Sequence, residues 1–74
     1  MRKVFALEEL DCAHCAAKME EAIGKLEGVS YVRVAFLTQK LTLEADDAVF
    51  EKVLAKAKKI IKKIEPDCRV VDRD

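Results

Sequence analysis

Two cysteines separated by two residues stand near the start of the chain, in the segment LDCAHCAAKME at positions 10–20. Two thiolates with this spacing can converge on one soft metal ion, as they do in many Zn(II) and Cu(I) sites. The same pair could cycle between dithiol and disulfide, or it could close a loop as a permanent disulfide. Three kinds of chemistry therefore compete for Cys12 and Cys15.

Cysteine count and compartment argue against the permanent disulfide. The chain of 74 residues has three cysteines, an odd number that does not suit a framework of paired disulfides. Its N-terminal segment reaches the charged Glu8 too early to contain the apolar region of a signal peptide. We therefore expect a cytoplasmic protein, and structural disulfides are rare in the cytoplasm.

Charge and hydropathy exclude two further classes of function. Fourteen basic residues balance fourteen acidic ones, whereas non-specific binding to nucleic acid needs a basic excess. No apolar run approaches the ~20 residues of a membrane-spanning helix, so we expect no direct insertion into a membrane. The length predicts a single domain over residues 1–74, which we expect to be a monomer and a free-standing protein.

Hydrophobic periodicity predicts six elements, in the order strand, helix, strand, strand, helix, strand. The expected strands are residues 3–10, 29–36, 41–45 and 68–72. The first helix runs from about residue 14 to Gly28, which sits where a helix end favours a positive φ. The second runs from an N-cap at Asp46 or Asp47 to Pro66, which stops it.

Each predicted helix has one apolar stripe, and each predicted strand has one apolar face. The stripes consist of Met19, Ala22, Ile23 and Leu26 in the first helix and of Val49, Val53, Ala57, Ile60 and Ile64 in the second. The economical packing places both helices on one side of a four-stranded antiparallel sheet. We therefore predict an α+β fold of the ferredoxin-like βαββαβ type.

In this fold Cys12 lies in the loop after the first strand and Cys15 lies in the first turn of the helix. Free N–H groups and the helix dipole at that point favour negative charge and lower a thiol pKa. An exposed loop lets a metal ion enter and leave, while a closed structural zinc site would need four ligands. A thioredoxin-type couple normally has aromatic and proline residues around its dithiol, whereas Ala13 and His14 stand here. The spacing therefore favours metal binding over redox turnover.

Three other residues are candidate ligands, each with a simpler role beside it. Asp11 could supply an oxygen donor or cap the helix, and His14 could coordinate or point into solvent. Cys68 could donate a third sulfur because the last strand should begin near the loop, but its alternation with Val70 indicates a core residue. The lysine-rich segment 56–63 is a solvated helix face or a surface for an acidic partner.

The segment LDCAHCAAKMEEAIGKLEGVSYVRV resembles the heavy-metal-associated domain, the module of copper chaperones and of the N-terminal arms of metal-transporting P-type ATPases. The resemblance covers nearly the whole chain and includes the late segment KIEPDCRVV. It implies a ferredoxin-like fold in which Cys12 and Cys15 are the metal thiolates. It also implies that Leu10 replaces the buried methionine beneath the loop and that Glu9 stands where the family usually has glycine.

The residue before the first cysteine bears on the choice of metal. Copper-handling members of the family usually have threonine, serine or histidine there, whereas Asp11 resembles the zinc, cadmium and lead ATPases. Zn(II) and Cd(II) prefer higher coordination with an oxygen donor, while Cu(I) is satisfied by two thiolates. The resemblance and Asp11 together favour Zn(II) or Cd(II), with Cu(I) as the alternative.

We therefore predict a metallochaperone-like protein, not an enzyme, that holds one soft metal ion. It would pass the ion to a metal-transporting P-type ATPase or to that transporter's soluble metal-binding domain. One alternative is a Cu(I) chaperone. Another, from a different functional class, is a small dithiol oxidoreductase that uses Cys12 and Cys15.

Overall fold

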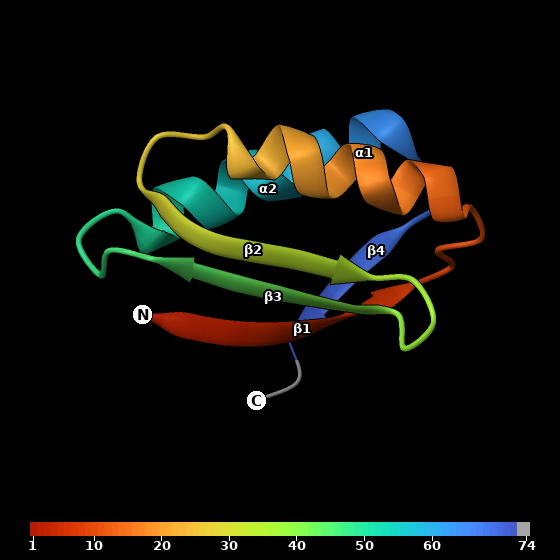
Figure 1. Ribbon diagram of the computed structural model, residues 1–74, viewed down its shortest axis with the longest axis horizontal. Helices are drawn as coiled ribbons and strands as arrows, with labels where there is room; N and C mark the ends of the chain where they lie inside the picture. The colour runs from red at the N-terminus through yellow and green to blue at the C-terminus, as the bar shows by residue number, and fades with distance from the viewer. Residues whose placement is uncertain (73–74) are drawn as a thin grey trace.

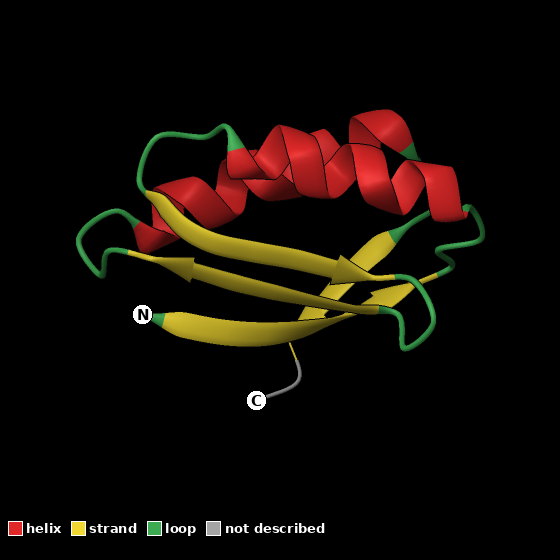
Figure 2. Cartoon of the chain, viewed as in Figure 1, coloured by secondary structure: helices red, strands yellow, loops and turns green. Residues whose placement is uncertain are grey.

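Six elements follow one another in the order that the periodicity predicts, in a computed structural model that describes residues 1–72 (Figures 1 and 2). They are β1 (Arg2–Glu8), α1 (Ala13–Gly24), β2 (Val29–Ala35), β3 (Lys40–Ala45), α2 (Phe50–Ile64) and β4 (Arg69–Asp72).

The four strands form one antiparallel sheet in the order β2-β3-β1-β4. Both helices lie on the same face of this sheet, so the molecule has two layers (Figure 1). The predicted ferredoxin-like arrangement is confirmed. In the pairing of β1 with β4, Glu8 lies opposite Arg69. The start of β4 is therefore beside the end of β1, as the sequence predicts.

The core lies between the sheet and the helices. Phe5 and Leu7 alternate along β1, and each is 2% exposed, whereas their neighbours Val4 and Ala6 are less buried. Leu41 on β3 is fully buried on the same face. Because burial of apolar side chains is the main favourable term in folding, this alternation fixes which face of each strand meets the helices.

The helices contribute the predicted stripes, and three further residues are buried, Ala16 on α1 among them. Met19 and Ile23 on α1 are fully buried, as expected. The periodicity did not identify Phe50 and Ile61 on α2 as core residues, yet each is 1% exposed. Within residues 1–72, neither helix has the length and apolar character needed to cross a membrane.

The start of α2 differs from the prediction. The Asp46 carboxylate accepts a hydrogen bond from the Ala48 N–H (3.4 Å), and the Val49 N–H donates to the Asp46 carbonyl (3.0 Å). These bonds form a turn ahead of the helix, and α2 itself is capped by Val49 without a side-chain bond. The expected N-cap at Asp46 or Asp47 was therefore wrong, because Asp46 uses its carboxylate in the turn.

The end of α1 also differs. The helix ends at Gly24, and Gly28 lies in the turn that leads into β2. Gly28 has a φ of 96°, and a Cβ atom there would come within 2.9 Å of the Val49 side chain. The positive φ was predicted correctly, but it belongs to a close approach between the turn and the start of α2 rather than to the helix end.

A carboxylate ties α1 to the edge of the sheet. Glu20 accepts a hydrogen bond from the Val34 N–H of β2 over 2.8 Å. Because β2 is an edge strand, this bond occupies a backbone donor that would otherwise be open to another strand. It also fixes the position of α1, and with it the loop at the start of the helix.

Candidate functional site

The connection from β1 to α1, residues 9–12, lies at the end of the molecule where α2 ends and β4 begins (Figure 1). Leu10 is fully buried and holds this loop to the core, in agreement with its expected place beneath the loop. Cys12 and Cys15 are half-buried, and Asp11 is exposed. The fold therefore presents two thiols at the surface on a loop that is anchored from below.

Glu9 has a φ of 64°, in the left-handed region of the backbone. This conformation is energetically unfavourable for an L residue with a side chain, whereas glycine adopts it readily. The family that the sequence resembles usually has glycine at this position, and the φ of Glu9 supplies the physical reason. This chain makes the same turn with a strained residue.

Cys12 is the N-cap of α1. Its backbone is extended (φ −126°, ψ 114°), and its Sγ accepts a hydrogen bond from the Cys15 N–H over 3.2 Å. Its carbonyl accepts the Ala16 N–H (3.1 Å). The alternative role considered for Asp11, that of helix cap, is thus wrong, because the sulfur of the next residue occupies that position.

The hydrogen bonds around the pair give the two thiols unequal acidity. The Cys15 thiol, and then the Cys15 N–H, donate to Cys12 and lower the pKa of the Cys12 thiol. The same side-chain bond, followed by desolvation and the Cys12 charge, raises the pKa of Cys15 to about 11. The pKa of Cys12 is thus lowered first by the Cys15 thiol and only then by the free N–H groups at the helix start, and the prediction of a lowered pKa was wrong for Cys15. The pair is suited to hold one thiolate beside one thiol.

Glu65 is a residue of this site that the sequence analysis missed. It is the half-buried C-cap of α2, with its N–H bonded to the Ile61 carbonyl (2.8 Å). After the Cys12 side chain and desolvation, the Glu65 carboxylate contributes to the raised pKa of Cys15, and after burial its charge contributes to the raised pKa of Cys68. The predicted topology held a signal for it, since Glu65 lies three residues before Cys68, where the strand expected beside the loop begins.

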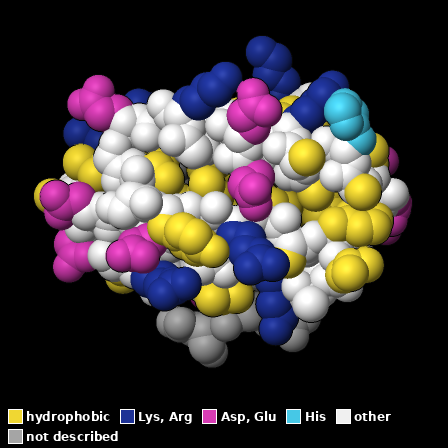
Figure 3. Space-filling model, viewed as in Figure 1, with side chains coloured by type: hydrophobic (Ala, Val, Ile, Leu, Met, Phe, Trp, Pro, Cys, Tyr) yellow, Lys and Arg dark blue, Asp and Glu magenta, His cyan; other side chains and the backbone are white. Residues whose placement is uncertain are grey.

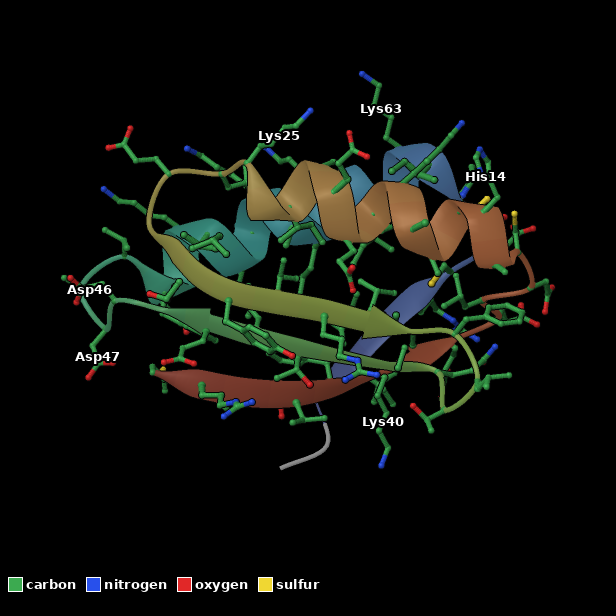
Figure 4. All side chains as sticks on the ribbon, viewed as in Figure 1. His14, Lys25, Lys40, Asp46, Asp47 and Lys63 are labelled. Atoms are coloured by element: carbon green, nitrogen blue, oxygen red, sulfur yellow. The ribbon has the colours of Figure 1, made fainter. Side chains whose placement is uncertain are left out.

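The remaining predicted ligands are not gathered around the dithiol. His14 is exposed and points away from the body of the molecule (Figures 3 and 4). Cys68 is 4% exposed, and burial raises the pKa of its thiol, followed by the charges of Glu65 and Asp11. In the described part of the chain, no three His, Cys, Asp or Glu residues form a group that could hold a metal ion. Cys12 and Cys15 thus form a two-sulfur site.

Two thiols suit a soft metal ion, since thiolate sulfur is the preferred ligand of Cu(I) and a good ligand of Zn(II). With two protein ligands rather than four, the pair would leave coordination positions open. Open positions suit an ion that is taken up and passed on, because a second protein can supply the missing ligands.

Known proteins that resemble this chain in sequence also handle metal ions. Residues 4–68 match the sequence profile of the heavy-metal-associated domain. The zinc/cadmium/lead-transporting P-type ATPase of Escherichia coli (strain K12) is 42% identical over 59 residues, which are 76% of this chain and 8% of that ATPase. The copper chaperone CopZ of Enterococcus hirae is 35% identical over 48 residues, which are 65% of this chain and 70% of the chaperone.

A solved structure of a metal-binding domain has the same fold as this chain. The N-terminal domain of ZntA, determined in solution in its Zn(II) form, superposes with a TM-score of 0.72 and 32% identity. The superposition covers 99% of this chain and 92% of that domain. The chain therefore corresponds to a small part of the transporting relative, about 8% of its length, and to most of a domain of this type.

Proposed function

The chain belongs to the heavy-metal-associated domain family, and we propose that it binds one heavy-metal ion through the thiolates of Cys12 and Cys15 and passes it to a partner protein. The observation that carries this proposal is the bonding between the two cysteines at an accessible loop. The Cys12 sulfur already accepts hydrogen bonds from Cys15, so the two sulfurs share one small region of the surface.

The ion that we propose is divalent, Zn(II) or Cd(II), rather than Cu(I). Asp11 adjoins the first cysteine, and the Glu65 carboxylate is near enough to Cys15 that, after Cys12 and desolvation, its charge contributes to the raised pKa of that thiol. Two thiolates neutralise a divalent ion, so a nearby carboxylate can add an oxygen bond, whereas a Cu(I) bis-thiolate is already negative. The 42% identity to a zinc, cadmium and lead transporter supports this choice, and the 35% identity to a copper chaperone supports the alternative.

Uptake and transfer follow from the unequal thiols. An arriving ion meets Cys12 first, because the hydrogen bonds from Cys15 favour its thiolate form. Cys15 then gives up its proton as it binds the ion. In transfer, a thiolate of the partner binds the ion before the first cysteine leaves, so no bare ion is released.

The partner that we propose is a metal-transporting P-type ATPase or its soluble metal-binding domain. The support is that relatives of this chain include such transporters and a chaperone. We place the encounter in the cytoplasm, with the chain as a monomer. A half-buried dithiol is accessible to the facing thiols of another small domain without unfolding of the loop.

A second candidate function, dithiol oxidation and reduction, has one observation in its favour. Cys12 has a lowered pKa and Cys15 a raised one, which is the inequality that a nucleophilic and a resolving thiol would show. In that reaction Cys12 would attack a substrate disulfide and Cys15 would displace the product thiol. Two electrons would pass from the dithiol to the substrate.

The test is a titration of the reduced chain with Zn(II), Cd(II) and Cu(I), each against a competing chelator of known affinity. The proposal expects saturation at one ion per chain and a sulfur-to-metal charge-transfer band. Substitution of Asp11 should weaken binding of the divalent ions only. Absence of metal binding, together with reversible turnover of a Cys12–Cys15 disulfide by a substrate, would select the oxidoreductase instead.

A further inference from the structure

Two residues other than glycine have a positive φ in the described part of the chain, Glu9 at 64° and Gln39 at 54°. Glu9 follows β1 and Gln39 precedes β3, so both lie at the same end of two paired strands. They also line the same surface pocket. Strained backbone of this kind persists where its surroundings hold it in place, and it is concentrated at functional sites.

Gln39 is bonded to the chain on both sides of Glu9. Its carbonyl accepts the Leu7 N–H over 2.8 Å, and its side-chain amide donates to the Leu10 carbonyl. Its own N–H donates to the Phe36 carbonyl (3.3 Å) and closes the turn between β2 and β3. The turn therefore holds Gln39 in place. Gln39 in turn holds Leu7 and Leu10, which lie on either side of the strained residue Glu9.

The bond from the Gln39 side-chain amide is made to the carbonyl of Leu10, two residues before Cys12. The Leu10 side chain is fully buried, so the core fixes this residue from below, while the Gln39 amide fixes its carbonyl. The position of the Cys12 sulfur depends on this backbone. A site that is held in its binding geometry before the ion arrives loses less conformational entropy on binding.

We propose that Gln39 is a positioning residue for the metal-binding loop, acting through the Leu10 carbonyl. This inference rests on the proposed function of Cys12 and Cys15. A supporting residue of this kind changes metal affinity by about tenfold to a hundredfold when it is lost. We expect loss of the Gln39 side chain to speed release of the ion, because the loop then lacks the hydrogen bond to the Leu10 carbonyl.

The decisive variant is Gln39→Gly. Glycine adopts a positive φ without strain, so this substitution removes the side chain without straining the backbone of the turn. We therefore expect no loss of thermal stability. The side-chain amide is lost, however, and we expect release of Cd(II) to a chelator to become about tenfold faster. Gln39→Glu keeps the length of the side chain but cannot donate in its charged form, and it should also speed release. Thr38→Ala, in the same turn, is the matched control and should release Cd(II) at the wild-type rate.

A second readout does not depend on metal. Amide hydrogen exchange at Cys15 in the apo protein reports the bond to the Cys12 sulfur, and it should be faster in Gln39→Gly than in Thr38→Ala. Wild-type rates of Cd(II) release and of exchange in Gln39→Gly would overturn the inference and leave the proposed function intact. Failure of the wild-type chain to bind Cd(II) would overturn the proposed function and, with it, the role of Gln39.

Discussion

The backbone N–H of Cys15 donates a hydrogen bond to the Sγ of Cys12 over 3.2 Å, so the first candidate metal ligand is also the N-cap of α1. The helix and the dithiol are therefore one local structure. Formation of the helix brings the two sulfurs together before any ion is present. The Cys15 thiol, and after it this N–H, lower the pKa of Cys12 and so favour its thiolate form, the form that binds metal.

Removal of the Cys15 thiol should make Cys12 a weaker acid. The largest cause of the lowered pKa of Cys12 is the side-chain bond from Cys15, so Cys15→Ala should raise this pKa toward the ordinary value of 9.0. The pH dependence of alkylation at Cys12, followed by mass spectrometry, measures the change. Cys68→Ala is the control. An alkylation profile for Cys12 that does not move in Cys15→Ala would contradict the hydrogen-bond explanation.

Relief of the strain at Glu9 should stabilise the apo protein. Glu9→Gly places at a φ of 64° a residue that adopts it freely, and we expect a gain of about 1 kcal/mol in the free energy of unfolding. Denaturant unfolding measures it. Glu9→Ala removes the same carboxylate but keeps a Cβ atom, so it should bring little gain. Equal stabilisation by both variants would point to charge rather than to backbone strain.

The sequence pattern predicted the architecture because the apolar periods of the strands and helices are regular. It placed Cys68 near the metal loop because the topology pairs β1 with β4. Local competition for hydrogen bonds was not visible in the pattern. Cys12 rather than Asp11 caps α1, and Asp46 forms a turn before α2, because each choice depends on the backbone angles of a few residues.

Two members of the site, Glu65 and Gln39, could not be read from their local sequence. Glu65 lies at the end of α2 and reaches Cys15 only through the packing of the two helices. Gln39 lies in a short polar turn, and its bond to Leu10 spans 29 positions in the chain. Glu65 lies within the segment KIEPDCRVV, to which the resemblance assigned no role for it, and Gln39 lies within no motif, so only the assembled fold reveals their contacts.

Loss of the Cys68 sulfur should affect stability more than metal binding. Cys68 is 4% exposed and belongs to the core, so Cys68→Ala should cost ~1–2 kcal/mol of stability as a small cavity forms. Its affinity for Zn(II) should stay close to that of the wild type. Thermal melts of the apo protein and a Zn(II) titration test the two statements. A loss of more than tenfold in affinity with unchanged stability would instead make Cys68 a ligand.

Asp11 should matter for divalent ions alone. It is exposed and does not cap α1, so Asp11→Ala should leave the helix intact. If its carboxylate binds the ion, affinity for Zn(II) and Cd(II) should fall on the order of tenfold to a hundredfold, while Cu(I) affinity stays the same. Glu27→Ala, which removes an exposed carboxylate just beyond α1, controls for net charge. Equal weakening for Cu(I) and Zn(II) in Asp11→Ala would favour the copper-chaperone alternative.

The most direct test of the account is Cd(II) binding by the reduced wild-type chain and by the double variant Cys12→Ser/Cys15→Ser. The wild type should bind one Cd(II) ion with a sulfur-to-metal charge-transfer band. The double variant should show no band and no tight binding, yet keep its circular-dichroism spectrum, because a serine at position 12 can still cap α1. Tight binding of Cd(II) by a folded double variant would contradict the account, since the ion would then be held without Cys12 and Cys15.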